Sequence, residues 1–264
     1  MSRKQTTQHP RCRLAFTLIE LLVVVAIITL LISILLPSLK RAKEQSRTVV
    51  CRANIRQVAM AFLLYGQDYG AIPGTYWQGE IDTDWSGRNN RKYLAHPDRY
   101  HHPIETSVLW RYMNHEDRIL ACPTAHREAN TFYDYTVPIR IHGARIDLPW
   151  KMLYPPDPRR PRENRQFFRG IILLLEEDRI FYNELYDDGS WAWFDQFSHR
   201  HFGECNIGYL DGSVDTFQAP QGINPDVEER ADLKARNVKI EINGKVYPIH
   251  DASRDRFGWI NRVH

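Results

Sequence analysis

A long apolar run near the N-terminus is the strongest pattern along the chain. From Leu18 to Leu36 every residue is apolar except Glu20, Thr29 and Ser33. An α-helix rises about 1.5 Å per residue, so a helix of this length spans most of a bilayer core of roughly 30 Å. The pattern therefore predicts a transmembrane helix over about residues 18–36.

The residues before this run indicate which way the helix is inserted. Arg3, Lys4, Arg11 and Arg13 precede it, and residues 1–15 contain no acid. Because basic flanks stay in the cytoplasm, the rest of the chain is expected on the outer side of the membrane. An ordinary signal peptide has an apolar region of about 7–15 residues followed by a small-residue cleavage site. This run is longer and no such site follows it.

After Pro37 the spacing changes to that of an amphipathic helix. Small or apolar positions recur every three to five residues, at Leu39, Ala42, Ser46, Val49, Ala53, Val58, Phe62 and Tyr65. Gly66 and Gly70 end the pattern, so the sequence predicts one helix over residues 16–70. Proline lacks a backbone N–H, so Pro37 is expected to bend or locally melt this helix. A membrane helix followed by a separate soluble helix is the alternative.

Strand-like patterns replace the helical spacing from about Ile72 onward. The runs most typical of strands are residues 168–177, 180–185, 206–210 and 238–242. Residues 77–104 and 151–166 are polar or rich in proline and are predicted to be surface loops. The simplest architecture is an α+β fold in which a mostly antiparallel sheet lies across the long N-terminal helix.

Composition excludes two broad classes. The 264 residues are 43% hydrophobic and 25% charged, which is typical of a folded chain and not of disorder. Lys and Arg number 35 against 32 Asp and Glu, and this excess of positive charge is too small to indicate a nucleic-acid surface. The four cysteines, Cys12, Cys51, Cys122 and Cys205, form no Cys-x-x-Cys pair, and no zinc motif is present.

Glu20 is the residue that a plain membrane anchor does not explain. A carboxylate inside the hydrocarbon costs about 2.5 to 3.5 kcal/mol on insertion scales, so it normally has a partner. The surrounding stretch, AFTLIELLVVVAII, closely resembles the N-terminus of type IV pilins and of the pseudopilins of type II secretion systems. This resemblance implies a role for the acid in assembly.

In that family a prepilin peptidase removes a basic leader and methylates the new N-terminus. Carried over, the cut falls between Ala15 and Phe16, and Glu20 becomes the fifth residue of the mature chain. The family usually has Gly before the cut, whereas Ala15 stands here. The resemblance implies that Glu20 pairs with the N-terminal amine of a neighbouring subunit and that Pro37 gives the helix some compliance in the filament.

Two further stretches resemble pilin-like proteins of planctomycete-type bacteria. Residues 51–73 are similar to the segment that follows the N-terminal helix there. HFGECNIGYLDGSVDTF, residues 201–217, is similar to a C-terminal processing-associated domain, in which His201, nine residues, and then Asp211 and Gly212 form the motif. From the residues alone, Asp211-Gly212 predicts a β-hairpin with a two-residue type I′ turn.

His201 has two interpretations. It could be a structural residue that hydrogen-bonds to a neighbouring strand, or a ligand or catalytic base with Asp211, Asp215 or His199 as its partner. No nucleophile motif such as Gly-x-Ser-x-Gly occurs, so catalysis is not predicted. The scattered His101, His102, His115 and His126 are expected on the surface.

Calcium is the one cofactor hypothesis. Asp211, Ser213 and Asp215 alternate as at the start of a calcium loop, but the Gly and the distant Glu of an EF-hand are not in place. Major pseudopilins of type II secretion bind calcium in a C-terminal loop, which keeps the hypothesis open.

The cysteines outside the leader allow one disulfide in an oxidising compartment. ILACPTA, residues 119–125, is similar to a Cys-Pro element of the same pilin-like group, and Cys51–Cys122 is the preferred pair. Three reduced, buried thiols are the alternative.

These patterns and resemblances together predict the organisation of the chain. Residues 1–15 form a cytoplasmic leader, 16–70 the pilin-like helix, 71–219 a β-rich globular domain, and 220–264 a C-terminal extension without an assigned role. The expected protein is a single-pass inner-membrane protein with its globular domain on the periplasmic side.

The predicted function is that of a prepilin-like, non-enzymatic subunit of a type II secretion pseudopilus or a type IV pilus-like filament. Its implied partners are other pilin or pseudopilin subunits, the prepilin peptidase and methylase, the assembly platform and the inner membrane. The alternative is an anchored extracytoplasmic binding module for glycan or cargo that does not polymerise. Aromatic side chains would suit glycan stacking in that case; the candidates are Trp77, Trp85, Trp110, Trp191 and Trp193.

Overall fold

The computed structural model describes most of the chain outside its termini and several loops. The described residues are 18–74, 83–125, 132–138, 141, 143–147, 150–154, 166–177, 189–191, 195–219, 235–242 and 244–248. The predicted cut between Ala15 and Phe16, Cys12 and the strand-like run 180–185 lie outside them. The chain divides into two units, Met1–Lys43 and Glu44–His264, and each is described by itself.

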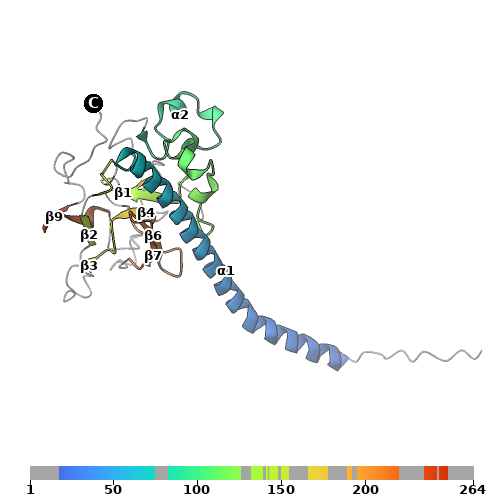
Figure 1. The fold of residues 1–264 in the computed structure, drawn as a ribbon. Helices are drawn as coiled ribbons and strands as arrows, with labels where there is room; N and C mark the ends of the chain where they lie inside the picture. The colour runs from blue at the N-terminus through green and yellow to red at the C-terminus, as the bar shows by residue number, and fades with distance from the viewer. Residues whose placement is uncertain are drawn as a thin grey trace, which may run out of the picture. The chain divides into compact units, whose positions relative to one another are not determined.

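A single helix, α1, occupies Leu18–Tyr69 (Figure 1). It ends where Gly66 and Gly70 predict, and Gly70 has a left-handed φ of 75° that closes the helix with a bond from its N–H to the Gly66 carbonyl. The helix continues through Pro37, so the local melting predicted there is absent. The alternative prediction, a membrane helix followed by a separate soluble helix, is wrong.

In the first unit α1 is apolar and exposed. The large apolar side chains from Leu18 to Leu39 are between 46% and 78% exposed. Thr29 and Ser33 donate their hydroxyls to the backbone carbonyls of Val25 and Leu30, so these polar groups are satisfied within the helix. By length and composition this is a helix that could cross a membrane.

In the second unit one face of α1 is buried in the core. The buried helix residues recur every three or four positions, at Cys51, Ile55, Val58, Ala59, Ala61, Phe62, Tyr65 and Gly66. Their neighbours on the opposite face, including Met60 and Leu64, are exposed. The predicted amphipathic stripe is right at Val58, Phe62 and Tyr65, but it is wrong at Val49 and Ala53, which are exposed.

The central sheet lies against this face of the helix (Figure 1). Its strand order is β5-β1-β4-β6-β7, formed by β1 (Tyr135–Pro138), β4 (Ile172–Glu176), β5 (Ser190–Trp191), β6 (Cys205–Tyr209) and β7 (Val214–Phe217). Every neighbouring pair is antiparallel except β1 and β5. The residues of β4 and β6 are all buried, which explains the apolar run Ile172–Leu175 of β4; the buried polar residues of the two strands are Glu176 and Asn206.

A second sheet brings part of the C-terminal extension into the domain. Its order is β3-β2-β8-β9, all antiparallel, formed by β2 (Trp150–Tyr154), β3 (Gln166–Phe167), β8 (Lys239–Ile242) and β9 (Lys245–Pro248). The loop predicted for residues 151–166 is therefore wrong over residues 151–154. Met152 and Leu153 are buried there, and the prolines that follow hid this short apolar run.

Along the chain, short helical segments lie between α1 and β1. They are α2 (Arg91–Ala95), η2 (Pro97–Arg99), η3 (Pro103–Thr106), η4 (Trp110–Met113) and η5 (Arg118–Leu120), with η7 (Ala235–Asn237) later in the chain. The surface position expected for His102 is wrong, because its side chain is buried and caps η3 by accepting the Ile104 N–H.

The aromatic side chains considered for glycan stacking are mostly in the core. Trp85 and Trp191 are fully buried, and Trp110 is partly buried against the core. Trp77 and Trp193 lie outside the described residues. Trp85, Trp110 and Trp191 therefore pack in or against the core and offer little surface for a sugar ring.

The β6–β7 hairpin is confirmed, but its turn differs from the prediction. Among the described residues, Asn114, His115 and Phe202 are the non-glycine residues with positive φ, so Asp211 does not have the conformation that a type I′ turn requires. Gly212 alone has it, at φ 78°. A bond from the Gly212 N–H to the Tyr209 carbonyl closes a three-residue loop.

Gly208 on β6 tests the contact between helix and sheet. A Cβ at this position would lie 2.5 Å from Cγ2 of Ile55, which is β-branched and fully buried on α1. We expect Gly208→Ala to lower the free energy of unfolding by about 1–3 kcal/mol, measured by chemical denaturation of the full chain in detergent.

Gly170→Ala is the matched control, because its new Cβ would meet Tyr209 at an ordinary 3.5 Å. This variant should stay within about 0.5 kcal/mol of the wild type. Equal stability of the Gly208→Ala and Gly170→Ala variants would contradict the described packing.

Candidate functional site

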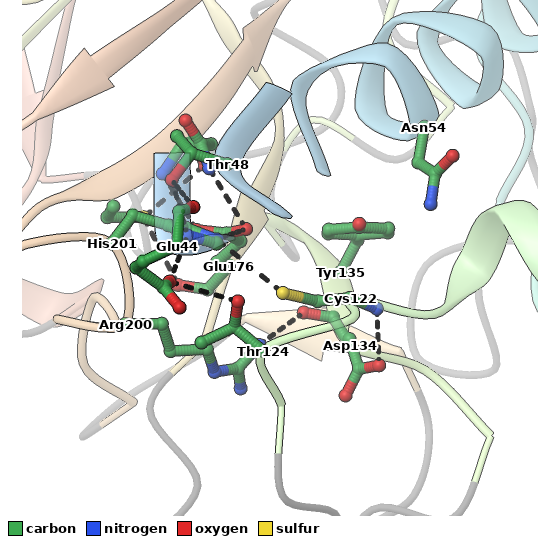
Figure 2. A network of polar contacts seen from close by, with 12 residues as sticks. Glu44, Thr48, Asn54, Cys122, Thr124, Asp134, Tyr135, Glu176, Arg200 and His201 are labelled. Carbon is green, nitrogen blue, oxygen red and sulfur yellow. Dashed lines mark hydrogen bonds and ion pairs between the residues drawn. The ribbon is translucent and has the colours of Figure 1, made fainter. Parts of the chain in front are cut away.

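A cluster of buried and half-buried polar side chains lies where the buried face of α1 begins, near the start of the second unit (Figure 2). Glu44, Thr48 and Cys51 lie on one face of α1, because residues three and four apart are neighbours on a helix surface. Cys122 comes from the loop after η5, and Glu176 is the last residue of β4. The last member of the cluster, His201, precedes β6.

His201 lies at the centre of this cluster and uses both ring nitrogens. Its Nε2 lies 2.9 Å from Oε1 of Glu176 and 3.5 Å from Sγ of Cys122. Its Nδ1 lies 3.0 Å from Oγ1 of Thr48 and 3.3 Å from Oε1 of Glu44. The ring is buried, so these four side chains form its whole polar environment among the contacts described (Figure 2).

Glu176 is a fully buried carboxylate held from two sides. Its Oε2 accepts the backbone N–H of Asn206 at 2.9 Å, and its Oε1 accepts the Asn206 side-chain amide at 3.2 Å. Burial acts to raise its pKa, but the hydrogen bond and charge of His201, together with the charge of Arg200, hold the pKa below the ordinary value. Glu176 is therefore an anion in the core.

The same interactions act on His201 in the opposite direction. Burial acts to lower the pKa of the imidazole, but its hydrogen bonds to Cys122 and Glu176 and their charges raise this pKa to about 10. In this structure, His201 and Glu176 form a buried ion pair. Removing one member of such a pair would leave an uncompensated charge in the core.

Two thiols complete the cluster. Hydrogen bonding from Cys51 lowers the pKa of Cys122 to about 6, and the same bond, with burial, raises the pKa of Cys51. The Cys122 N–H donates to Oδ2 of Asp134 at 2.7 Å, and Asn54 on α1 donates to the carbonyl of Ala121 at 2.9 Å. These bonds fix the Cys122 loop to both the helix and the start of the sheet.

The ligand atoms of Cys51, Cys122, Glu176 and His201 all lie within 4.8 Å of one another. This donor set of two sulfurs, one nitrogen and one oxygen could hold a metal ion. Cys122 and His201 also resemble a thiol–imidazole pair, but a nucleophile must reach its substrate, and both side chains are buried. The geometry gives no positive evidence for catalysis.

The structure brings together some of the residues that the sequence singles out. Cys51 and Cys122, the predicted disulfide pair, meet in the cluster as free thiols, and their pairing stays a prediction. His201 joins them, but its partners are Glu44 and Glu176 and not Asp211, Asp215 or His199. Glu44 and Glu176 were missed because 157 and 25 residues separate them from His201 in the sequence.

The rest of the His201 motif forms the hairpin turn. Oδ1 of Asp211 accepts the Ser213 N–H at 2.8 Å, and Oδ1 of Asp215 accepts the Thr216 N–H at 2.9 Å. A Cβ at Gly212 would lie 3.2 Å from Leu63 of α1. Asp211 and Gly212 thus shape the tip of a hairpin that packs on the helix. Calcium binding by Asp211, Ser213 and Asp215 stays a prediction.

Comparison with known proteins gives one match, at the N-terminus. Residues 10–36 match the family described as the prokaryotic N-terminal methylation motif. No curated protein and no solved structure matches the chain. The motif implies processing by a prepilin peptidase and assembly with pilin-type subunits, and the α+β fold with a long apolar N-terminal helix is pilin-like.

The buried ion pair predicts a large effect of replacing His201. We expect His201→Ala to lower the free energy of unfolding by about 3–5 kcal/mol, because Glu176 loses its buried counter-charge. The measurement is chemical denaturation of the full chain in detergent.

His101→Ala is the control, since His101 also faces a carboxylate, Asp117 at 3.2 Å, but its side chain is 90% exposed. Its effect should stay below about 1 kcal/mol. If both substitutions have the same small effect, the cluster does not stabilise the domain.

Proposed function

We propose that the protein is a prepilin-like subunit of a type II secretion pseudopilus or a type IV pilus-like filament. In this proposal the leader is removed between Ala15 and Phe16, the new N-terminus is methylated, and subunits assemble through α1. The observation that carries the proposal is the methylation motif over residues 10–36, which leads directly into an exposed apolar helix.

The contrast between the two units supports this role. The apolar side chains from Leu18 to Leu39 are exposed, whereas the residues from Cys51 to Gly66 on one face of the same helix are buried by the domain. An apolar surface of this extent is not stable in water, so it needs lipid or other apolar helices around it. A filament subunit requires both surroundings, since its helix lies in the membrane before assembly and packs against neighbouring helices afterwards.

Glu20 supplies the means of alignment between subunits. It lies in the first turn of α1, where the helix dipole favours a negative charge. In an apolar environment, pairing with the positive N-terminal amine of a neighbouring subunit would offset the cost of burying either charge. The pairing would fix the axial register of the two chains.

The globular domain performs no chemistry in this proposal, and the protein is itself the substrate of the peptidase and methylase. The domain would lie on the periplasmic side of the inner membrane, in contact with the assembly platform and other subunits. An anchored glycan-binding module has less support, because Trp85 and Trp191 are buried in the core.

Replacing Glu20 tests assembly. We expect Glu20→Ala to reduce filament-sized cross-linked oligomers at least tenfold, while leader removal continues, because the register-fixing charge is lost and the cut site is untouched. The measurement is chemical cross-linking in cells that carry the assembly system, followed by immunoblotting of sheared filaments and membranes.

Thr29→Ala is the matched control in the same apolar helix, because the Thr29 hydroxyl bonds only to the carbonyl of Val25 among the described contacts. It should assemble as the wild type does. Normal assembly of Glu20→Ala would contradict the proposed register role. A wild-type chain that never forms oligomers would favour the binding module.

A further inference from the structure

We propose that Cys51, Cys122, Glu176 and His201 form a structural zinc site that fastens helix α1 to the central sheet. The site goes beyond the proposed filament role and does not depend on it. Its four ligands come from four separate segments of the chain: α1, the loop after η5, the end of β4 and the loop before β6.

The donor atoms fit zinc in type and number. Two thiolates, one imidazole and one carboxylate are ligands that zinc takes in tetrahedral sites, whereas calcium and magnesium prefer oxygen alone. All four donor atoms lie within 4.8 Å of one another, and all four residues are buried. A closed set of four protein ligands without an exposed position is typical of structural zinc.

The spacing of the ligands is close to that of a zinc site. With zinc–ligand bonds of about 2.0–2.3 Å, tetrahedral geometry separates ligand atoms by about 3.3–3.8 Å. Sγ of Cys122 lies 3.5 Å from Nε2 of His201, which is inside this range. Oε1 of Glu176 lies 2.9 Å from the same nitrogen, so a small outward movement of one carboxylate oxygen would admit the ion.

The residues around the ligands orient them as zinc sites require. Because Nδ1 of His201 faces Oε1 of Glu44 at 3.3 Å, the imidazole can donate this proton to a carboxylate and present Nε2 to the metal. Metal-bound histidines in proteins are commonly held in this way. Asn206 holds the carboxylate of Glu176 through its backbone and side-chain amides.

The negative charge of the zinc complex would be matched by a neighbouring cation. Zinc with two thiolates, one carboxylate and a neutral imidazole has a net charge of −1. The guanidinium of Arg200 acts electrostatically on Cys122 and Glu176 from beside the site, and it donates to the carbonyls of Asp134 and Glu177. A cationic neighbour of this kind lowers the cost of a buried anionic complex.

Zinc content and cobalt spectroscopy test the site directly. The full chain is purified from membranes in detergent without chelators, and its metal is measured by mass spectrometry. We expect one zinc per chain. After chelation under reducing conditions, added Co²⁺ should give sulfur-to-cobalt charge-transfer bands and the intense visible bands of a tetrahedral complex, and Zn²⁺ should displace it.

Matched variants separate the site from general effects of burial. Cys122→Ala should lose the zinc, whereas Cys205→Ala should keep it, since Cys205 is equally buried but bonds to the backbone carbonyls of Glu176 and Asn206. Glu44→Gln should fold and weaken zinc affinity about 10–100-fold, as expected for a residue that orients a ligand.

Two results would overturn the proposal. One is the absence of zinc together with the absence of cobalt bands in the reduced wild-type chain, which would leave a metal-free ion pair. The other is a Cys51–Cys122 disulfide, formed by oxidation and seen as a link between their peptides in the non-reduced protein and a loss of two hydrogen atoms in its intact mass.

Discussion

Burial of one face of α1 is the constraint on which the rest of the domain depends. Ile55, Val58 and Phe62 are fully buried, and each such side chain contributes about 1.5–3 kcal/mol when removed from water. Gly208 on β6 allows the sheet to approach the helix closely at Ile55. The all-buried strands β4 and β6 and the hairpin tip at Gly212 are arranged around this contact.

The polar cluster extends the same helix face beyond the apolar stripe. Thr48 and Glu44 lie about one and two turns before Cys51, so the geometry that buries Ile55 also brings these groups to His201. A buried ion pair such as that of Glu176 and His201 adds less stability than an apolar contact, but it is specific about which groups meet. Zinc would convert this arrangement from hydrogen bonds into coordinate bonds and fasten the helix to the sheet. A filament subunit pulled through its helix would benefit from such a fastening.

The sequence predicts local features of this protein well. The apolar run, the helical spacing after Pro37 and the ending at Gly70 predict α1, and the Asp211-Gly212 pair predicts a hairpin. The turn type was missed because Gly212 alone supplies the left-handed residue. Strand β2 was missed because only a few apolar residues, such as Met152 and Leu153, mark it.

The site could not be derived in the same way. Glu176 ends a strand of buried apolar residues, which is an unusual place for an acid, and that is the one local indication of its role. Cys122 and His201 are 79 residues apart, and Glu44 and His201 are 157 apart. These residues come together only when β4 and β6 fold onto α1. Their spacing along a single sequence gives no sign that they are close in space. Cys51 and Cys122 were singled out as a possible disulfide pair through a resemblance, and not as members of a cluster with His201.

The intact mass and N-terminal sequence of the mature protein show whether the chain is processed as a prepilin. The protein is extracted from membranes of cells with and without the prepilin peptidase, and its intact mass and N-terminal sequence are determined. A prepilin-like subunit should begin at methylated Phe16 only when the peptidase is present. A chain that retains Met1 in both cells would contradict it and would leave α1 as an anchor for a domain that does not assemble.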